Sequence, residues 1–178
     1  MIYAIATPAA LSAYSAANKS DIPVIFCAVS DPVAAGLTES LEAGYNNCNG
    51  TSDILDFSAQ VDLIQSIQPD VKKIGVLYTT TEANSMSQLE SFKAVCTEKG
   101  IEVVDQGVSG AADIPQAATT LASQVDCINN FTDNNVVNNL SIVLEKANAA
   151  NIPVYGSEIE QVKNGCLASI SIDYIALG

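Results

Sequence analysis

Short runs of apolar residues alternate with longer stretches of helical periodicity along most of the chain. The runs are typical of strands buried on both faces, because apolar and polar positions do not alternate within them. They are IYAIA (2–6), IPVIFCAV (22–29), KIGVLY (73–78), IEVVDQGV (101–108), VDCINNF (125–131), IPVYG (152–156) and CLASISID (166–173). Helices are expected over residues 8–19, 31–41, 55–68, 83–100, 113–124, 134–150 and 157–164. Strands that alternate with helices predict a mainly parallel α/β architecture.

Capping residues support two of these helix boundaries. Asp31 and Pro32 are expected to cap and begin the helix over 31–41. Gly100 is expected to end the helix over 83–100, because glycine readily adopts the left-handed conformation found at helix C-termini.

The number of predicted strands divides the chain into two unequal Rossmann-like lobes. Five strands follow residue 72, enough for one doubly wound parallel sheet with strand order 2-1-3-4-5. Only two clear strands precede residue 53, because residues 45–53 are interpreted as a polar turn region. Two strands cannot bury both faces of a sheet, so the N-terminal lobe is predicted to be incomplete. The expected organisation is a partial lobe over 1–53, a connecting helix and linker over 54–71, and a C-terminal lobe over 72–178.

A near-repeat agrees with two related lobes. AANKSDIPVIFCAVSD (16–31) and KANAANIPVYGSEIE (146–160) share a helix rich in alanine, then Ile-Pro-Val, an aromatic residue and an acid. Units that lead from a helix into a strand commonly look this way, so the repeat alone leaves the relationship open.

Charge and composition exclude several classes of function. The chain is 48% hydrophobic, enough for a core, and its net charge of −13 should repel nucleic acid and anionic membrane surfaces. It has no arginine, which removes the usual bidentate clamp for carboxylate or phosphate. It has no histidine, which argues against most hydrolase triads and many zinc sites. We therefore expect no metal site.

The five cysteines form no CxxC pair, and their odd number excludes a complete disulfide framework. Cys27 and Cys127 lie inside apolar runs and are predicted to be reduced and buried. No apolar run is long enough to span a bilayer, so no direct membrane insertion is expected.

Polar residues follow almost every predicted strand. The carboxyl ends of parallel strands meet at one edge of a sheet, and ligands bind there in open α/β folds. The residues expected to line one cleft at these ends are Thr7, Asp31, Glu82, Asn84, Ser85, Thr132, Asp133, Asn134 and Ser157. Helix capping is the competing explanation, since Ser, Thr, Asp and Asn are the residues that caps require.

Known catalytic and cofactor motifs are missing from the sequence. There is no GxxxxGK[ST] loop and no GxGxxG fingerprint, and no nucleophile is paired with a base. The hydroxyl-rich TTTEANS (79–85) could hold a phosphate in a flavodoxin-like domain, but Glu82 would repel it. Binding without catalysis is the favoured interpretation, with no enzyme activity and no cofactor.

Several motifs together resemble one family. AIATPAA, IPVIFCAVSDPVAAGL, NGTSD, IGVLYTTTEANS, TDNNV, IPVYGSE and IDYIALG, in this order, look like the solute-binding proteins of an ABC-transporter family with the type I periplasmic-binding fold. The resemblance implies two lobes with a cleft between them. It also implies capture of a small solute, an aromatic amino acid being favoured, and delivery to an ABC permease from a secreted or lipid-anchored, extracytoplasmic location. Members of the family carry further segments before and after the matching region, so the chain is expected to be a fragment.

The resemblance also implies a ligand chemistry. The carboxylate of an amino acid would be bound by hydroxyls and helix N–H groups. Its ammonium would be bound by one of four acids, Asp31, Glu82, Asp133 or Glu158. Its side chain would pack on one of three aromatic residues, Tyr78, Phe131 or Tyr155. A small-molecule-sensing regulatory domain of the same fold and a flavodoxin-like domain remain as alternatives.

Overall fold

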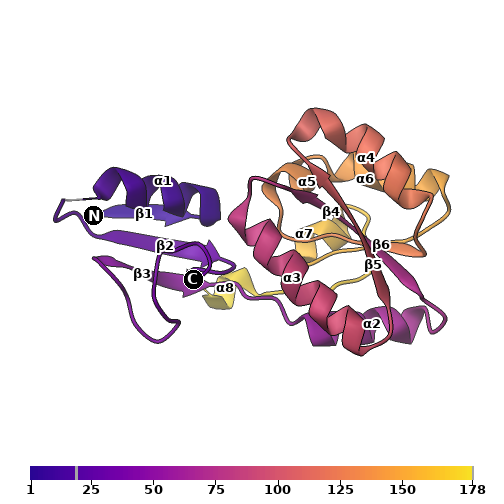
Figure 1. Cartoon of the computed structure of the whole chain (residues 1–178), viewed down its shortest axis with the longest axis horizontal. Helices are drawn as coiled ribbons and strands as arrows, with labels where there is room; N and C mark the ends of the chain where they lie inside the picture. Colours follow the sequence, from indigo (N-terminus) through magenta and orange to yellow (C-terminus); the bar gives the residue numbers. More distant parts are fainter. Residues whose placement is uncertain (19, 178) are drawn as a thin grey trace.

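The computed structural model describes residues 1–18 and 20–177, which form two α/β lobes side by side (Figure 1). The N-terminal lobe contains a parallel sheet in the order β1-β2-β3. Its strands are β1 (Ile2–Ile5), β2 (Val24–Val29) and β3 (Cys48–Ser52), and its helix is α1 (Thr7–Ala17).

Helix α1 covers one face of this sheet. It packs on β1 and β2, and Ala10, Val24 and Phe26 are buried between the helix and the strands. Side chains on the other face point away from this core, and Tyr3 and Ile5 are 59% and 62% exposed. Among the described residues, therefore, the N-terminal sheet is covered on one face.

Two predictions of secondary structure in the N-terminal lobe are wrong. Residues 48–52, interpreted as part of a polar turn region, form the parallel strand β3. Gly50 permits this pairing, because a Cβ at residue 50 would lie 2.0 Å from the carbonyl oxygen of Phe26. This strand was not predicted from the sequence, because CNGTS contains no apolar run.

The helix expected over residues 31–41 is replaced by turns. Asp31 caps the segment as expected, with its carboxylate accepting from the backbone N–H of Ala34 at 2.9 Å. Gly36 has φ +70°, and the N–H groups of Gly36 and Leu37 donate to the carbonyls of Val33 and Pro32. This is the hydrogen-bond pattern that ends helices, so the two caps leave room for about one turn.

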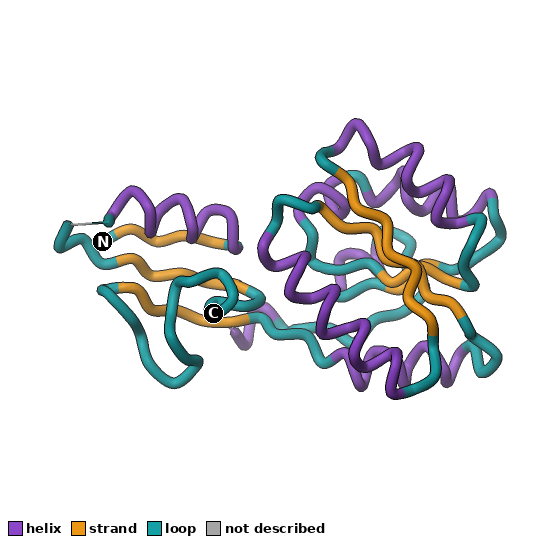
Figure 2. Tube along the Cα trace, in the orientation of Figure 1, coloured by secondary structure: helices purple, strands orange, loops and turns teal. Residues whose placement is uncertain are grey.

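The C-terminal lobe is a parallel sheet with helices on both faces (Figure 2). Its strands are β4 (Lys73–Thr79), β5 (Glu102–Val108), β6 (Cys127–Asn129) and β7 (Val154–Tyr155), in the order β5-β4-β6-β7. Its helices are α2 (Phe57–Ile67), α3 (Ala83–Glu98), η1 (Ala111–Asp113), α4 (Ile114–Ala122), α5 (Asn134–Asn138), α6 (Leu140–Ala149) and α7 (Ile159–Lys163). A short helix, α8 (Tyr174–Leu177), follows and lies beside the N-terminal lobe in Figure 1.

Separate clusters of buried side chains fill the two faces of this sheet. On one face, α4, α5 and α6 pack on Leu77, Ile128 and Val154. On the other face, α2 and α3 pack on Ile74 and Val76. The rings of Phe57, Phe92 and Phe131 lie 5.4–5.5 Å apart within this second cluster.

The sheet of the C-terminal lobe has four described strands where five were expected. The fifth run, residues 166–173, lies beside β7, where the N–H of Leu167 donates to Val154 and the N–H of Gly156 donates to Ala168. In a regular parallel ladder, the N–H of Gly156 would donate to the carbonyl of Leu167 instead of Ala168. The segment therefore pairs with β7 irregularly and does not form a strand. The observed order matches 2-1-3-4 of the predicted 2-1-3-4-5. The helix expected over 134–150 is divided at Asn139 into α5 and α6.

All five cysteines are free, but Cys27 is only partly buried. Cys127 is fully buried as predicted. Cys27 lies on the uncovered face of the N-terminal sheet, in register with Ile5, so an apolar run did not imply burial. The prediction that Cys27 is buried is wrong for this reason.

Candidate functional site

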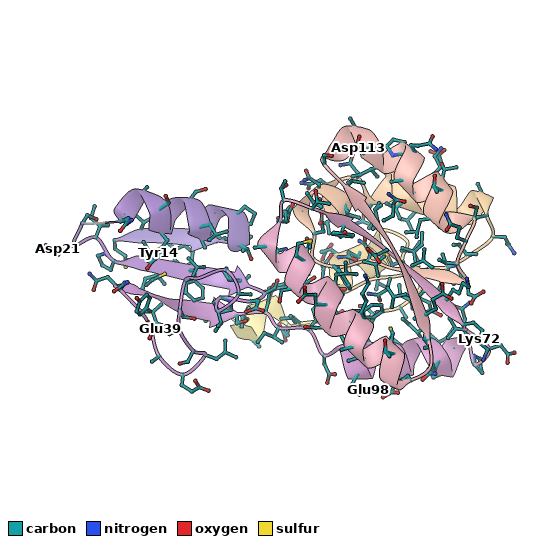
Figure 3. All side chains as sticks on the ribbon, viewed as in Figure 1. Tyr14, Asp21, Glu39, Lys72, Glu98 and Asp113 are labelled. Carbon is teal, nitrogen blue, oxygen red and sulfur yellow. The ribbon has the colours of Figure 1, made fainter. Side chains whose placement is uncertain are left out.

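A cavity of about 320 Å³ lies between the two lobes, at the carboxyl ends of their strands. The N-terminal lobe contributes the ends of β1, β2 and β3, and the C-terminal lobe contributes the starts of α3, α5 and α7 together with α8. The lining residues are Ile5, Ala6, Thr7, Ala28, Ser30, Asp53, Asn84, Thr132, Asn134, Val137, Asn138, Glu158, Gln161 and Tyr174. Figure 3 shows the labelled acids Asp21, Glu39, Glu98 and Asp113 away from the region between the lobes.

The backbone is bent sharply where the first two strands reach this cavity. Ala6 and Ala28 have φ values of 68° and 52°, which non-glycine residues adopt rarely and at an energetic cost. Ala6 turns the chain from β1 into α1, and the register of β2 on β3 shifts between Phe26 and Val29. Both alanines line the cavity, so the strained positions coincide with the candidate site.

The start of α1 has no side-chain cap. Ala6 occupies the N-cap position and its side chain cannot accept a hydrogen bond, while Thr7, the first helical residue, is buried in the cavity wall. The first N–H groups of a helix lack partners within the helix, and the helix dipole makes this end favourable for anions. The N-terminal lobe therefore presents a partially positive helix end to the cavity.

Asp53 is the buried acid of the cavity. It follows β3, it is 4% exposed, and its Oδ2 accepts from the hydroxyl of Tyr174 at 2.8 Å. Its Oδ1 is buried without a hydrogen-bond partner among the described residues. Burial and the neighbouring Asp53 carboxylate raise the pKa of Tyr174, so the tyrosine remains a donor. One oxygen of Asp53 is thus left for a donor from elsewhere.

Asn84 supplies a similar oxygen from the C-terminal lobe. It lies in the first turn of α3, and its Nδ2 donates to the carbonyl of Thr132 at 3.4 Å. Its Oδ1 is buried with no partner in the described parts of the chain. Thr132 Oγ1 accepts from Gln88 Nε2 at 2.8 Å and lies 3.4 Å from Ser30 Oγ of the other lobe.

Glu158 lines the cavity but its carboxylate is already engaged. Its two oxygens accept from the backbone N–H groups of Glu160 and Gln161 at 2.7 and 2.8 Å, which caps α7. Gln161 is buried and bonds to Asn130 and Phe131, so it holds the wall of the cavity in place.

The structure divides the nine residues expected from strand ends into two groups. Four of them line the cavity: Thr7, Asn84, Thr132 and Asn134. The other five lie outside its lining: Asp31, Glu82, Ser85, Asp133 and Ser157.

The polar atoms of that second group bond within the protein. Asp133 is fully buried, and its carboxylate accepts from the N–H and hydroxyl of Thr79, the hydroxyl of Ser85 and the N–H of Val136 at 2.6–2.9 Å. Glu82 Oε2 accepts from the backbone and side-chain nitrogens of Asn134.

Two more members of this group are engaged by neighbours. Ser157 donates to the carbonyl of Asn130, and Asp31 accepts from Ser87.

The expected aromatic walls are not in the cavity. Phe131 and Tyr155 are fully buried in the core of the C-terminal lobe, and Tyr78 packs against the same core. Sequence reasoning missed Asp53, because β3 was interpreted as a turn. The available signal was the acid that closes NGTSD, directly after a short Thr-Ser pair.

The described residues contain neither a metal-binding cluster nor a membrane-spanning helix. Over 1–18 and 20–177, His, Cys, Asp and Glu side chains do not gather in threes that could hold a metal ion. Among the same residues, each helix is too short or too polar to cross a bilayer.

Comparisons with known proteins agree on one family. The family model described as "ABC transporter substrate binding protein" matches residues 1–178. A "Tyrosine-binding protein" of Clostridioides difficile (strain R20291) is 42% identical over 178 residues, which are all of this chain and 51% of that protein. The chain thus spans about half the length of this relative.

Two solved structures of related proteins resemble this chain to different degrees. An ABC domain from Streptococcus pneumonia in complex with L-Trp is 36% identical, with a TM-score of 0.95 over 99% of this chain and 59% of that one. A ligand-free, open substrate binding protein with adhesive properties from Clostridium difficile is 38% identical, with a TM-score of 0.71 over the same shares. The overall structure of this chain is therefore more similar to the L-Trp complex than to the open structure.

Membership of a substrate-binding family supports the expectation of binding without catalysis, and the fold is the type I periplasmic-binding fold expected from the sequence. The match over the whole chain and the relative at 42% identity place this protein in the ABC transporter substrate-binding protein family.

Proposed function

We propose that this chain belongs to an extracytoplasmic solute-binding component of an ABC importer, and that it binds an aromatic L-amino acid in the cavity between its lobes. The observation that supports this most directly is that one cavity contains both hydrogen-bond acceptors without donors and a partially positive helix end. Two buried oxygens without donors, on Asp53 and Asn84, share the cavity with the uncapped start of α1. An amino acid zwitterion has an ammonium group that can donate to these oxygens and a carboxylate that can accept from the helix start.

Asp53 and Asn84 are the proposed partners of the ligand ammonium. An ammonium has three donors, and these oxygens come from opposite lobes. A buried acceptor without a partner costs about 1–3 kcal/mol, so a donor arriving in the cavity recovers that free energy. Asp53 also supplies the compensating negative charge. From the sequence alone, this role was predicted for one of four other acids, Asp31, Glu82, Asp133 or Glu158.

The start of α1 is the proposed partner of the ligand carboxylate. Its free N–H groups and the hydroxyls of Thr7, Ser30 and Thr132 can bind an anion without arginine, which the chain lacks. Thr7 and Thr132 are among the residues expected from strand ends, and Asn134 completes the polar lining on the C-terminal side.

Ile5, Ala28, Val137 and the ring of Tyr174 are the proposed apolar wall for the ligand side chain. The cavity of about 320 Å³ lies at the small end of the range for ligand sites, about 300–1,000 Å³, which suits one amino acid. The favoured ligands are tryptophan and tyrosine, since a relative carries the name "Tyrosine-binding protein" and another was solved with L-Trp.

The partner and location follow from the family as proposals. A substrate-binding protein of an ABC importer meets its permease outside the cytoplasm, and we propose that the whole protein is secreted or lipid-anchored. No nucleic acid partner is proposed, because a net charge of −13 opposes it.

Isothermal titration calorimetry of the 178-residue chain with L-Trp, L-Tyr, L-Phe, L-Lys and glucose tests the ligand. We expect heat of binding with the aromatic amino acids alone. Asp53→Asn keeps the size of the side chain and an acceptor for Tyr174, and it should weaken binding about 30-fold or more, because one partner of a buried charge pair is lost. Asp21→Asn, on an exposed turn, is the matched control.

A parent chain that binds none of the amino acids would contradict the proposed function. A parent that binds them, with Asp53→Asn binding equally well, would remove Asp53 from the site while leaving the ligand class intact.

A further inference from the structure

Asp31 was singled out by the sequence as a candidate ligand contact, yet it lies outside the cavity lining. It stands in the N-terminal lobe, directly after Ser30 and the end of β2. Its Oδ2 accepts a hydrogen bond from the hydroxyl of Ser87, which lies on α3 of the C-terminal lobe. Its Oδ1 accepts from the N–H of Ala34, which holds the carboxylate in place.

A second hollow, distinct from the ligand cavity, borders this contact. It measures about 310 Å³, and its wall includes Asp31, Ser87, Gln88 and the apolar side chains of Val33 and Phe57. Ser30 is the residue that the two hollows share. Asp31 and Ser87 therefore bridge the lobes from a place where they do not border the proposed ligand.

Neighbouring residues link this bridge to the cavity wall. Ser30, which precedes Asp31, lies 3.4 Å from Thr132 across the lobes, and Thr132 accepts from Gln88 at 2.8 Å. Gln88 directly follows Ser87 on α3. A ligand that contacts Ser30 thus holds the residue next to Asp31. A ligand that contacts Thr132 holds, through Gln88, the residue next to Ser87.

We propose that the Asp31–Ser87 hydrogen bond is an interlobe lock, which holds the lobes closed and sets ligand affinity and residence time without touching the ligand. The proposal rests on the proposed function for its ligand. Its physical basis is that an interaction present only in the closed arrangement shifts the population toward that arrangement. A hydroxyl that donates to a carboxylate is a charge-assisted bond, stronger than one between neutral groups.

Ser87→Ala is the decisive variant, because the Ser87 hydroxyl is bonded to Asp31 alone among the described residues. Alanine is a better helix former than serine, so this change in α3 should leave the lobe at least as stable. Ser91→Ala is the matched control, since Ser91 borders the same hollow one helical turn further along and forms no side-chain hydrogen bond with described residues.

In calorimetry and stopped-flow binding with L-Trp, Ser87→Ala should bind roughly 5- to 20-fold more weakly, mainly through faster dissociation. Ser91→Ala should match the parent. Asp31→Ala should weaken binding too, and adding Ser87→Ala to it should cause little further loss, because both changes remove one bond. Binding by Ser87→Ala within twofold of the parent would overturn the lock.

Small-angle X-ray scattering of the free chain separates the lock from the proposed function. If the parent binds no amino acid, the proposed function fails, and the lock is judged by the radius of gyration alone. Ser87→Ala should then be more expanded than both the parent and Ser91→Ala. Identical scattering profiles for all three would contradict the lock.

Discussion

In the C-terminal lobe, helices cover both faces of the sheet, whereas in the N-terminal lobe α1 covers one face and the described residues leave the other open. Both lobes nevertheless bring the carboxyl ends of parallel strands to the same cavity. The geometry of the site therefore depends on strand direction and on the turns that follow the strands. The stability of each lobe depends on how its sheet is covered.

The open face has a distinct character. Tyr3, Ile5 and Cys27 share it with polar residues of β3, and the first two are more than half exposed. In the C-terminal lobe, the corresponding central positions Ile74, Val76 and Leu77 are fully buried. Changes on the open face should thus be tolerated where changes in the C-terminal core are not.

Thiol reactivity should show the largest contrast. Cys27 should react with a thiol reagent in the native chain, and Cys127 about a thousandfold more slowly, because its reaction requires unfolding. Hydrogen bonds from Thr51 and Tyr3 lower the pKa of Cys27, whereas burial raises the pKa of Cys127 to about 12. The thiolate is the reactive form, so Cys27 labelling should increase with pH and level off at a lower pH than for an ordinary thiol.

Mass spectrometry of the labelled peptides measures both rates. The three other cysteines are buried and should behave like Cys127. Equal labelling of Cys27 and Cys127 would show that the two sheets are covered alike.

Phe92→Ala should cause the largest loss of stability. The ring is fully buried between Phe57 and Phe131, and removing it leaves a cavity that costs about 3–5 kcal/mol. Thermal and urea unfolding by circular dichroism measures the loss, with Phe92→Leu as the milder control. A loss below about 1 kcal/mol for Phe92→Ala would mean that this core is not packed as described.

Asp133→Asn should destabilise the chain by about 2–4 kcal/mol. Asparagine places an NH₂ group where the carboxylate accepts from four donors, so at least one buried donor loses its partner. Urea unfolding gives the value. A variant as stable as the parent that no longer bound amino acids would instead make Asp133 a ligand partner, as strand-end reasoning had it.

Tyr3→Ser should change stability by no more than about 0.5 kcal/mol, because the side chain lies on the open face. Ala4→Ser, one residue along and facing α1, should cost about 1–3 kcal/mol by burying a hydroxyl. If the two variants unfolded alike, the difference between the faces of the N-terminal sheet would be disproved.

Much of the fold was predictable because long apolar runs mark most of the strands and helical periodicity marks most of the helices. The strand KIGVLY and the helix that follows it are found where expected. CNGTS was missed, because its pairing depends on the close approach of Gly50 to Phe26 rather than on apolar residues. The turn at residues 31–37 was missed, because Asp31 and Gly36 each favour a helix end and together they shorten the helix.

The site was harder to predict than the fold. Asp53 and Asp133 both follow strands and are both buried, so position along the sequence does not distinguish them. They differ in their neighbours, because Thr79 and Ser85 use both oxygens of Asp133, while Tyr174 uses one oxygen of Asp53. Tyr174 is about 120 residues from Asp53 along the chain, and only the folded structure brings them together.

Hydrogen exchange with and without L-Trp, read by mass spectrometry, tests most directly whether the ligand binds between the two lobes. Binding there should slow exchange in segments from both lobes, around Thr7 and Asp53 on one side and around Asn84 and Asn134 on the other, and leave the body of β5 unchanged. Protection confined to one lobe, or no change at a saturating concentration of L-Trp, would contradict the account.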